Sequence, residues 1–234
     1  MNMEYRNYFE FRQVNPEIYE GYKPPPYLNR VISSIPNARL LDFGCGFGQL
    51  LSALKSAGMT QAEGFDIAPE AIRHCQAHGL RCTDGNANPD FFNEHRGYFD
   101  FVVMSHVLEH FPKDQVIVQL RQVKEILKPG GGLLVMVPNA QSNTGAYWAY
   151  EDITHYQLFT SGSLYHVLRA AGFESIEFLD IDCTDGLPAH RKAVKRLFLR
   201  LYALNLRFWN RVTSSAFHAP STPIFSYEIK ALAR

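Results

Sequence analysis

One segment constrains this 234-residue chain more than any other: the run LLDFGCGFG at residues 40–48. Its apolar start predicts a buried strand, and the residues from Gln49 to Leu54 predict a helix directly after the glycines. Glycine has no Cβ to keep a ligand away from the backbone, so this arrangement predicts a cofactor site at the turn. A dinucleotide fold requires the spacing G-x-G-x-x-G, whose third glycine would stand at Gln49. Here the third glycine is Gly48, which comes one residue early.

The composition is that of an enzyme-sized intracellular chain. Hydrophobic residues make up 46% of it, and Lys+Arg and Asp+Glu both total 23, so no net field attracts nucleic acid. Residues 1–22 lack the apolar core of a secretory signal, and no run is long enough to span a membrane. The four cysteines form no C-x-x-C pair and no zinc spacing. We therefore expect a cytoplasmic protein without a metal.

Strand-like and helical segments alternate along the chain. Helices are predicted at 70–77, 113–127 and 163–171, with Thr160 or Ser161 as the N-cap of the last and Gly172 as its stop. Such alternation predicts an α/β fold with a doubly wound parallel sheet. The predicted strands are 38–43, 62–66, 81–83, 99–104, 133–137, 175–181 and 224–233.

Several motifs together resemble class I S-adenosylmethionine-dependent methyltransferases. The D-x-G-x-G-x-G spacing at 42–48 is similar to the first motif of that family, and Lys128-Pro129-Gly130-Gly131 is similar to the turn before its fifth strand. The segment Phe99–His110 resembles the fourth-strand motif of the branch that includes ubiquinone-biosynthesis, small-molecule and sugar methyltransferases. The resemblance implies S-adenosylmethionine as cofactor and a Rossmann-like, seven-stranded sheet, mostly parallel with an antiparallel last strand.

The same resemblance implies an organisation for the whole chain. We expect a single methyltransferase domain over 1–234, with an N-terminal cap at 1–27 and an acceptor loop at 138–160. A basic helical insertion at 182–223 precedes the last strand. Ligands bind at the carboxyl edge of such sheets, and the insertion leaves from that edge, so we expect it above the active site.

The resemblance also assigns cofactor contacts residue by residue. The amino-acid part of the cofactor is expected at Gly44, Cys45 and Gly46, and Asp42 and Ser105 are expected to bind the cofactor as well. Asp66, followed by Ile67, stands about 20 residues past the glycine turn, where a carboxylate can accept both ribose hydroxyls; alternatively it is only an acid at a helix N-terminus. The remaining segment, Asp84-Gly85-Asn86, is expected to hold the adenine or to be an ordinary turn.

Three histidines are candidates for the base that removes a proton from the acceptor. His106 and His110 follow the strand 99–104, whereas His155 lies in the acceptor loop, where Glu151 or Asp152 is expected to orient it. We favour His155, with His110 second; the alternative is that each histidine only packs or caps a helix. The H-x-x-E-H spacing of His106, Glu109 and His110 also fits an inverted zincin, but here the histidines follow a strand and the methyltransferase motif explains them.

Aromatic residues surround the predicted site. Those of the acceptor loop suit a sugar, another ring or the packing of a lid. The N-terminal tyrosines are expected to close over the cofactor. The two sets are Tyr147, Trp148, Tyr150 and Tyr156 in the loop, and Tyr5, Tyr8, Tyr19 and Tyr22 near the N-terminus.

The insertion is basic and amphipathic. No acid occurs between Gly186 and Tyr227, and apolar residues recur there at helical spacing. A helix of this kind fits an anionic membrane surface, which 190–212 would contact, or a phosphate-bearing substrate. The alternative is a helix that packs on the sheet edge or on a second subunit of a homodimer, with its charges solvated. Its cationic residues are Arg191, Lys192, Lys195, Arg196, Arg200, Arg207 and Arg211.

These observations predict a methyltransferase that acts on oxygen. The expected acceptor is a small molecule or glycan: a sugar, a nucleotide sugar or a lipid-linked glycan, as in polysaccharide biosynthesis. Alternatives are N- or C-methylation of another small molecule and a non-catalytic cofactor-binding or assembly subunit. A nucleic-acid acceptor is not expected, because no Asn/Asp-Pro-Pro-Tyr element follows the strand 99–104 and the net charge is zero. The expected location is the cytoplasm, with the inner face of the membrane as the alternative.

Overall fold

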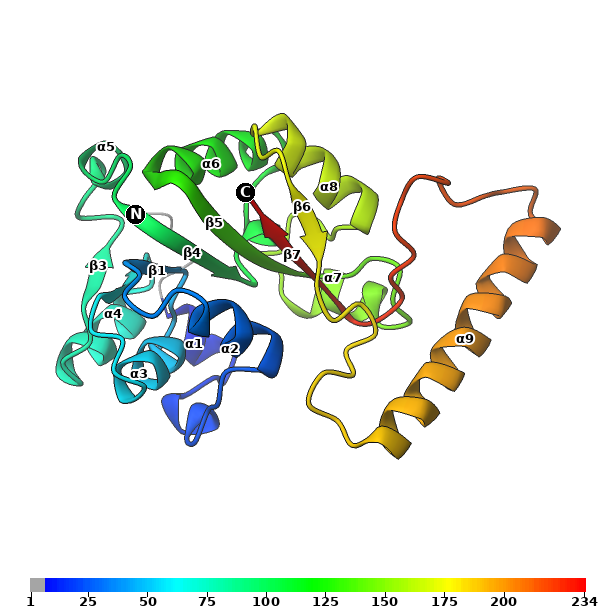
Figure 1. The fold of residues 1–234 in the computed structure, drawn as a ribbon, viewed down its shortest axis with the longest axis horizontal. Helices are drawn as coiled ribbons and strands as arrows, with labels where there is room; N and C mark the ends of the chain where they lie inside the picture. The colour runs from blue at the N-terminus through cyan, green and yellow to red at the C-terminus, as the bar shows by residue number, and fades with distance from the viewer. Residues whose placement is uncertain (1–6) are drawn as a thin grey trace.

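One sheet with the strand order β3-β2-β1-β4-β5-β7-β6 organises the computed structural model, which describes residues 7–234 (Figure 1). The strands β1 to β5 are parallel, and β7 is antiparallel to both of its neighbours, β5 and β6. The expected Rossmann-like sheet with an antiparallel last strand is thereby confirmed. The strands are β1 Leu40–Phe43, β2 Ala62–Asp66, β3 Cys82–Asp84, β4 Phe99–Ser105, β5 Leu127–Pro138, β6 Ile176–Phe178 and β7 Glu228–Ala233.

Helices connect the strands and cover both faces of the sheet. The short helices α1 (Tyr8–Phe11) and η2 (Pro16–Tyr19) precede α2 (Pro26–Ser33). Thr160 caps α8 as expected. Its hydroxyl accepts the backbone N–H of Ser163, and the Ser163 hydroxyl accepts the backbone N–H of Thr160. The other helices are α3 Gln49–Ser56, α4 Pro69–Ala77, α5 Phe91–Glu94, η3 Leu108–His110, α6 Lys113–Ile126, α7 Gly145–Glu151, α8 Ser161–Ala170 and α9 Ala189–Val212.

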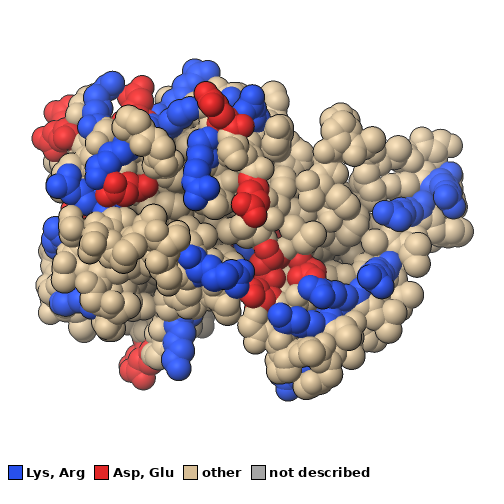
Figure 2. Space-filling model, viewed as in Figure 1, with Lys and Arg blue, Asp and Glu red and all other residues tan. Residues whose placement is uncertain are grey.

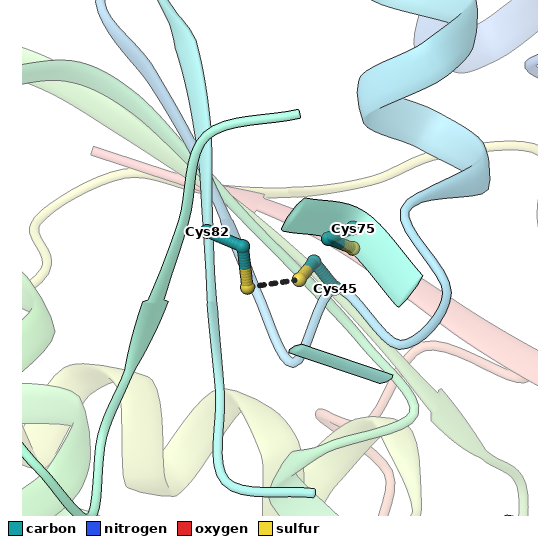
Figure 3. A group of neighbouring side chains, drawn as sticks. All are labelled: Cys45, Cys75 and Cys82. Atoms are coloured by element: carbon teal, nitrogen blue, oxygen red, sulfur yellow. Dashed lines mark hydrogen bonds between the residues drawn. The ribbon is translucent and has the colours of Figure 1, made fainter. Parts of the chain in front are cut away.

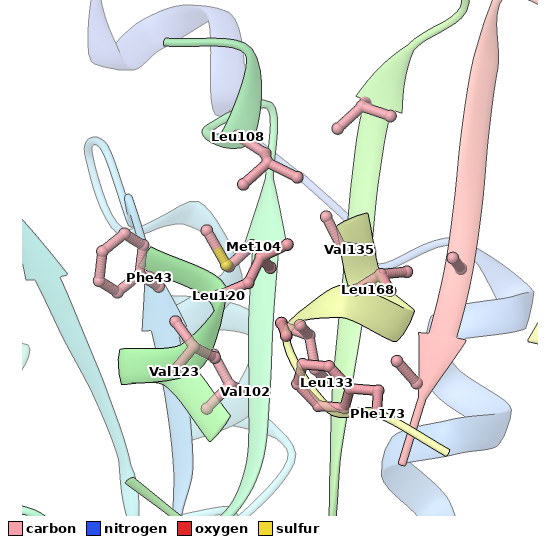
Figure 4. Close-up of a cluster of buried hydrophobic side chains, with 14 of the residues drawn as sticks. Phe43, Val102, Met104, Leu108, Leu120, Val123, Leu133, Val135, Leu168 and Phe173 are labelled. Carbon is pink, nitrogen blue, oxygen red and sulfur yellow. The ribbon is translucent and has the colours of Figure 1, made fainter. Parts of the chain in front are cut away.

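The central strands are buried on both faces, which is why they read as continuous apolar runs. On β4, Val102 and Met104 face the layer formed by α6 and α8, and Phe101 and Val103 face the opposite layer. Figure 4 shows the first layer, where Leu120 and Leu168 pack on Met104, Leu133 and Val135. This two-sided core holds the strand ends, and therefore the residues that follow them, in fixed positions.

Several predicted boundaries differ from the structure, and β6, for example, ends at Phe178 and not at Ile181. The strand β5 begins at Leu127, so Lys128-Pro129-Gly130-Gly131 lies in extended chain, at an irregularity in its pairing with β4. The strand β7 begins at Glu228 and not at Ile224. The side-chain amide of Asn139 donates to the carbonyls of Ile224 and Ser226, at 2.9 and 2.7 Å, and so replaces a strand partner there.

The sheet has a switch point at β1, which lies between β2 and β4. In open α/β sheets, ligands bind at the carboxyl ends of the strands at such a point. Glu228, the first residue of β7, pairs with Pro138, the last of β5, so the basic insertion leaves the sheet at this edge, as expected. Figure 1 shows α9 beyond β6 and β7, at the side of the sheet far from β1. The helix thus lies beside the acceptor loop and not above the glycine turn.

Within residues 7–234, no helix is both long enough and apolar enough to cross a membrane.

Candidate functional site

A cavity of about 670 Å³ opens at the carboxyl edge of the sheet. Its volume is in the range that holds a cofactor or drug-sized ligand. The structure places seven of the predicted site residues on its wall: Gly44, Gly46, Asp66, Ile67, Ser105, His106 and His110. These residues come from the ends of β1, β2 and β4 and from the turns that follow, so the topology gathers them in one place.

The glycine turn requires glycine for two separate reasons. Gly44 and Gly46 have positive φ angles of 78° and 52°, which residues with a side chain rarely adopt. At Gly44 an added Cβ would also lie 2.2 Å from Cγ2 of Val107. The backbone of the turn is therefore bare on the cavity side, and this cradle fits the amino-acid end of a nucleoside cofactor.

Asp66 is held rigidly beside this turn. Its Oδ2 accepts the N–H of Gly46 at 2.8 Å, and its Oδ1 accepts those of Ile67 and Ala68 at 2.7 and 2.8 Å. Burial raises the pKa of Asp66, against the lowering effect of the three N–H groups. A carboxylate has about four acceptor positions, so one remains on Oδ2. That position fits one hydroxyl group, and acceptance of both ribose hydroxyls would require the loss of a backbone bond.

The Cys45 side chain points away from the cavity. Its Sγ lies 3.4 Å from Sγ of Cys82, and Cys75 completes a group of three thiols behind the turn (Figure 3). Gly64 makes room for this group, because a Cβ there would lie 2.6 Å from Sγ of Cys45. Only the backbone of Cys45 is therefore available to a ligand at the turn.

The remaining predicted cofactor residues do not line the cavity. In the segment 84–86, Oδ1 of Asp84 accepts the backbone N–H of Asn86 at 2.9 Å, as in an ordinary turn. The same turn packs behind Asp66, since the N–H of Gly85 donates to the Asp66 carbonyl at 2.8 Å. Asp42 is buried beneath the glycine turn, and burial, with Asp66 and Cys75 nearby, raises its pKa to about 8. Contact of these residues with a cofactor stays a prediction.

Two cavity residues were missed in the sequence analysis. Among the described residues, Gln49 Oε1 and Gln119 Nε2 are buried without a hydrogen-bond partner, and both residues line the cavity. An unpaired buried acceptor and donor are costly unless a ligand or water pairs with them. The position of Gln49 directly after the glycine turn was a usable signal. For Gln119, which lies on the cavity side of α6, the sequence contained no such signal.

His106 carries a positive charge at neutral pH. Its Nε2 lies 2.8 Å from Oε1 of Glu228, and its Nδ1 lies 3.3 Å from Oε1 of Glu109. Burial lowers its pKa, but the two carboxylates outweigh this and raise the pKa to about 10. A histidine that is already protonated cannot accept a proton from an acceptor.

His110 has the opposite environment. The Thr154 hydroxyl donates to Oδ1 of Asp152 at 2.6 Å, so its oxygen accepts the Nδ1–H of His110, 2.8 Å away. Nε2 is then the basic nitrogen of this ring. Burial, together with the nearby His155, lowers the pKa of His110. The ring is therefore neutral at physiological pH and lies on the cavity wall.

His155 lies behind His110 and does not reach the cavity. Its side chain is 7% exposed, and the two imidazole centres are 4.7 Å apart. The expectation that a carboxylate orients this ring is wrong: Nδ1 bonds the Trp148 carbonyl at 2.7 Å, whereas Oδ2 of Asp152 is 3.8 Å from Nε2. The short helix α7 brings that carbonyl closer than either acid.

Glu109 is the most unusual group near the cavity. It is fully buried, and within residues 7–234 neither carboxylate oxygen accepts a well-formed hydrogen bond, although Oε1 lies 3.3 Å from Nδ1 of His106. Its ligand atoms and those of His110 and His155 all lie within 4.8 Å of one another, as do the three thiols of the cysteine group. Two imidazoles and a carboxylate suit a divalent cation, so this is the set beside the cavity that a metal would use, although the sequence analysis expects none.

The N-terminal segment closes one side of the cavity. Tyr8, Phe9, Arg12 and Tyr19 line it, whereas Tyr22 packs against the core below α2 and α3. Tyr5 lies outside the described residues. Arg12 Nη1 and Tyr8 Oη contact Oδ2 of Asp152, at 3.0 and 2.6 Å, and so join this segment to the acceptor loop.

Of the loop aromatics, Tyr156 lines the cavity, and Tyr147 and Tyr150 are exposed.

The fold and the site define an α/β protein with a nucleoside-type cofactor site at the switch point of its sheet. A family model described as "Methyltransferase domain" matches residues 18–177, more than half of the chain. The chain therefore belongs to the methyltransferase domain family. It is of the class I, S-adenosylmethionine-dependent type, and the expected cofactor, S-adenosylmethionine, is confirmed as that of the family.

Individual relatives agree with this assignment. The chain is 34% identical over 111 residues to a ubiquinone biosynthesis O-methyltransferase of Xanthomonas campestris, a match that covers 45% of each protein. The chain thus spans about half the length of the curated relatives it matches.

Solved structures share the fold. A SAM-dependent methyltransferase from Archaeoglobus fulgidus superposes with a TM-score of 0.65 at 20% identity and 97% coverage of both chains. Human N-acetylserotonin methyltransferase, solved with SAM, superposes with a TM-score of 0.57 at 17% identity, over 97% of this chain and 55% of that one.

Proposed function

We propose that this protein transfers a methyl group from S-adenosylmethionine to a hydroxyl group of a small-molecule or glycan acceptor. One observation carries the proposal: a single cavity of about 670 Å³ is lined by the glycine turn, by Asp66 and by the neutral base His110. When bound, the cofactor supplies a methyl group on a positively charged sulfur, which is already activated for transfer. The protein then has to bind both molecules, align them and accept one proton.

The cofactor-binding roles follow from the cavity wall. The backbone of Gly44, Cys45 and Gly46 faces the amino-acid part, where the unpaired Oε1 of Gln49 is a fitting acceptor for an ammonium group. The remaining acceptor position of Asp66 holds a ribose hydroxyl. Ile67 and the aromatic rings of Phe65 and Phe92 form the apolar wall that suits a base.

His110 is the residue that accepts the proton from the acceptor. It is neutral, and its ring is fixed by Thr154, which donates to Asp152. His155, favoured in the sequence analysis, acts through His110 as a positioning residue, since it lies behind that ring. His106 instead pairs with Glu109 and Glu228 and contributes a positive charge to the cavity wall.

The acceptor that we propose is a sugar, a nucleotide sugar or a lipid-linked glycan, as in polysaccharide biosynthesis. Support comes from the mixture of aromatic and polar side chains on the acceptor side, where Tyr156, Gln115 and Gln119 line the cavity. A ubiquinone precursor is the second candidate, because the 34% identical relatives carry that name. N- or C-methylation and a non-catalytic assembly role remain as alternatives.

The free state of the four cysteines supports a cytoplasmic location.

Calorimetric titration with S-adenosylmethionine tests the cofactor site. Asp66→Ala removes a charged hydrogen-bond acceptor worth about 1.5–3 kcal/mol, so we expect its Kd to rise about ten- to hundredfold. Asp90→Ala, at an exposed acid before α5, is the matched control and should bind as the wild type does. Unchanged binding by the Asp66 variant would contradict the proposed ribose site.

A screen with a labelled methyl donor tests the acceptor. Nucleotide sugars, lipid-linked sugars and ubiquinone precursors form its arms, and alkali-stable label on a hydroxyl of the first two supports the proposal. Label on a ubiquinone precursor alone would replace the proposed acceptor class. Tight cofactor binding without transfer to any arm would favour the non-catalytic alternative.

A further inference from the structure

The helix α9 is attached to the protein along one side only. It spans 24 residues, none of them buried. Its inward side is held by two hydrogen bonds to carbonyls, from Lys195 Nζ to Cys183 at 2.6 Å and from Tyr202 Oη to Gln141 at 3.2 Å. An ion pair between Arg196 and Asp182 adds a third attachment near the start of the helix. The opposite side of the helix faces solvent (Figure 1).

That outward side is the apolar one. Large hydrophobic residues recur along it three or four positions apart, so they form a continuous stripe on one face. Ordinary surface helices turn such a stripe toward the core, but here Phe198 is 63% exposed and Leu204 is 58% exposed. We define the outer stripe as Val194, Leu197, Phe198, Leu201, Leu204, Phe208 and Val212, each at least half exposed.

Positive charge flanks the outer stripe. Arg200, Arg207 and Arg211 lie along one border of it, two turns and then one turn apart on the helix, and all three are exposed. No acid occurs between Gly186 and Tyr227, so no carboxylate on this segment neutralises them. Figure 2 shows Lys and Arg side chains distributed along α9.

The exposed apolar stripe and the arginines beside it together indicate which kind of partner covers the outer stripe. A second copy of the chain would match the alternating three- and four-residue spacing of a coiled coil. It would also bring Arg200 and Arg207 of the two copies together without an acid between them, and like charges there are destabilising. An anionic lipid surface offers acyl chains for the stripe and phosphates for the arginines.

We propose that α9 docks this protein on an anionic membrane surface, with the outer stripe in the headgroup–acyl boundary. The helix is bonded to the segment after β5, which leads to Tyr156 in the cavity wall. Docking through α9 therefore holds the acceptor side of the cavity close to the lipid. This placement, which rests on the proposed function, makes the acceptor a lipid-linked one.

Vesicle co-sedimentation tests this proposal with the full chain. We expect binding to vesicles of phosphatidylcholine with phosphatidylglycerol, and much weaker binding to phosphatidylcholine alone. Each basic residue near an anionic surface contributes about fivefold in affinity, so the triple variant R200Q/R207Q/R211Q should bind about a hundredfold more weakly. A rise in ionic strength from about 0.1 M to about 1 M should weaken wild-type binding in the same direction.

Two further variants make the result specific. Leu201→Ser, Leu204→Ser and Phe208→Ser together should abolish co-sedimentation, whereas Lys23→Gln, Arg73→Gln and Lys113→Gln, exposed bases away from α9, should not change it. Calorimetric binding of S-adenosylmethionine by each variant shows that it is folded and keeps this test separate from that of the enzymatic function.

The proposal is overturned if wild-type protein stays in the supernatant with anionic vesicles at low salt. It is also overturned if sedimentation equilibrium without lipid shows a dimer that the serine variant dissociates, because the stripe would then be a subunit interface.

Discussion

Two histidines that follow β4, His106 and His110, differ in charge although their residue type is the same. His106 is bracketed by the carboxylates of Glu109 and Glu228, so it is a cation. His110 is bonded to the Thr154 hydroxyl and is neutral. His155 packs behind it, 7% exposed. At this scale, environment and not residue type decides which side chain can accept a proton.

Replacement of His110 should remove most of the activity and little of the cofactor affinity. A general base contributes about 10²–10⁴ to turnover, so we expect His110→Ala to lower kcat at least about a hundredfold, with Kd for S-adenosylmethionine changed less than about twofold. Because the pKa of His110 is lowered, the wild-type rate should be flat around pH 7 and should fall only in acid, where the ring protonates. Steady-state kinetics from pH 5 to 9 measure both effects.

The same assay separates His155 from His110. His155→Ala should lower kcat less than His110→Ala does and should shift the acid limb of the pH profile, because it changes the surroundings of the base. His166→Ala, an exposed histidine on α8, should have wild-type kinetics. Full activity of His110→Ala would refute the assignment, and activity that EDTA abolishes and Mg²⁺ or Zn²⁺ restores would show that Glu109, His110 and His155 act through a metal.

At the scale of elements, β7 contains a charged network in place of apolar packing. Lys230 is 3% exposed in this strand. Its Nζ lies 3.2 Å from Oε2 of Glu228 and 3.4 Å from Oδ2 of Asp180, and it lies 5.2 Å from the centre of the Tyr27 ring. Glu228 in turn contacts His106, so the network links the last strand to the cavity.

Removal of Lys230 should therefore destabilise the fold strongly. The loss of one partner from a buried ion pair costs about 3–5 kcal/mol, because the remaining carboxylates stay buried without a counter-charge. We expect Lys230→Ala to lower the free energy of unfolding by that amount in urea titrations at pH 7. Lys113→Ala, an exposed lysine at the start of α6, should change it by less than about 0.5 kcal/mol.

A double variant tests the reason for that loss. Lys230→Met combined with Glu228→Gln removes both charges. The double variant should therefore lose less free energy of unfolding than the sum of the losses in Lys230→Met alone and Glu228→Gln alone. Strict additivity would show that the two groups do not interact.

At the scale of the whole molecule, buried ionisable groups determine how stability depends on pH. Asp42 has a pKa raised to about 8, and His106 has one raised to about 10. In both cases the folded state binds the proton more tightly than the unfolded chain does. Their stabilising effect is thus full below the unfolded pKa and is lost as the pH rises through the folded pKa.

We therefore expect the free energy of unfolding to fall between pH 6 and 8, by at most about 1.4 kcal/mol per pH unit for Asp42. The His106 contribution is smaller, since its side chain is 43% exposed and solvent screens it. Asp42→Asn should flatten the slope between pH 6 and 8, and Asp90→Asn, an exposed acid, should leave it unchanged. Urea titrations at several pH values measure this, and an unchanged slope in Asp42→Asn would contradict the raised pKa.

The alternation of strands and helices could be predicted from local patterns, and the antiparallel tail and the cofactor class from the family resemblance of the motifs. The run at 40–48 and Asp66 were sufficient to predict which residues meet at the glycine turn, since backbone conformation there depends on glycine and on one acid at a strand end. A predicted strand boundary was wrong where a side chain distant in sequence takes the place of a strand partner, as Asn139 does at Ile224 and Ser226. Gln119 and the direction of the Cys45 thiol could not be predicted, because both depend on packing between elements.

The glycine turn, the continuous apolar runs of the central strands and the acid-free basic segment were determined by the sequence alone, because each reflects neighbouring residues and backbone geometry. Only the tertiary structure decided the state of the three histidines and the outward direction of the apolar stripe on α9. His106 meets Glu228 across 122 residues of sequence, and His110 meets Thr154 across 44. Charge and exposure depend on whatever folding brings within a few ångströms, and a linear pattern does not contain that information.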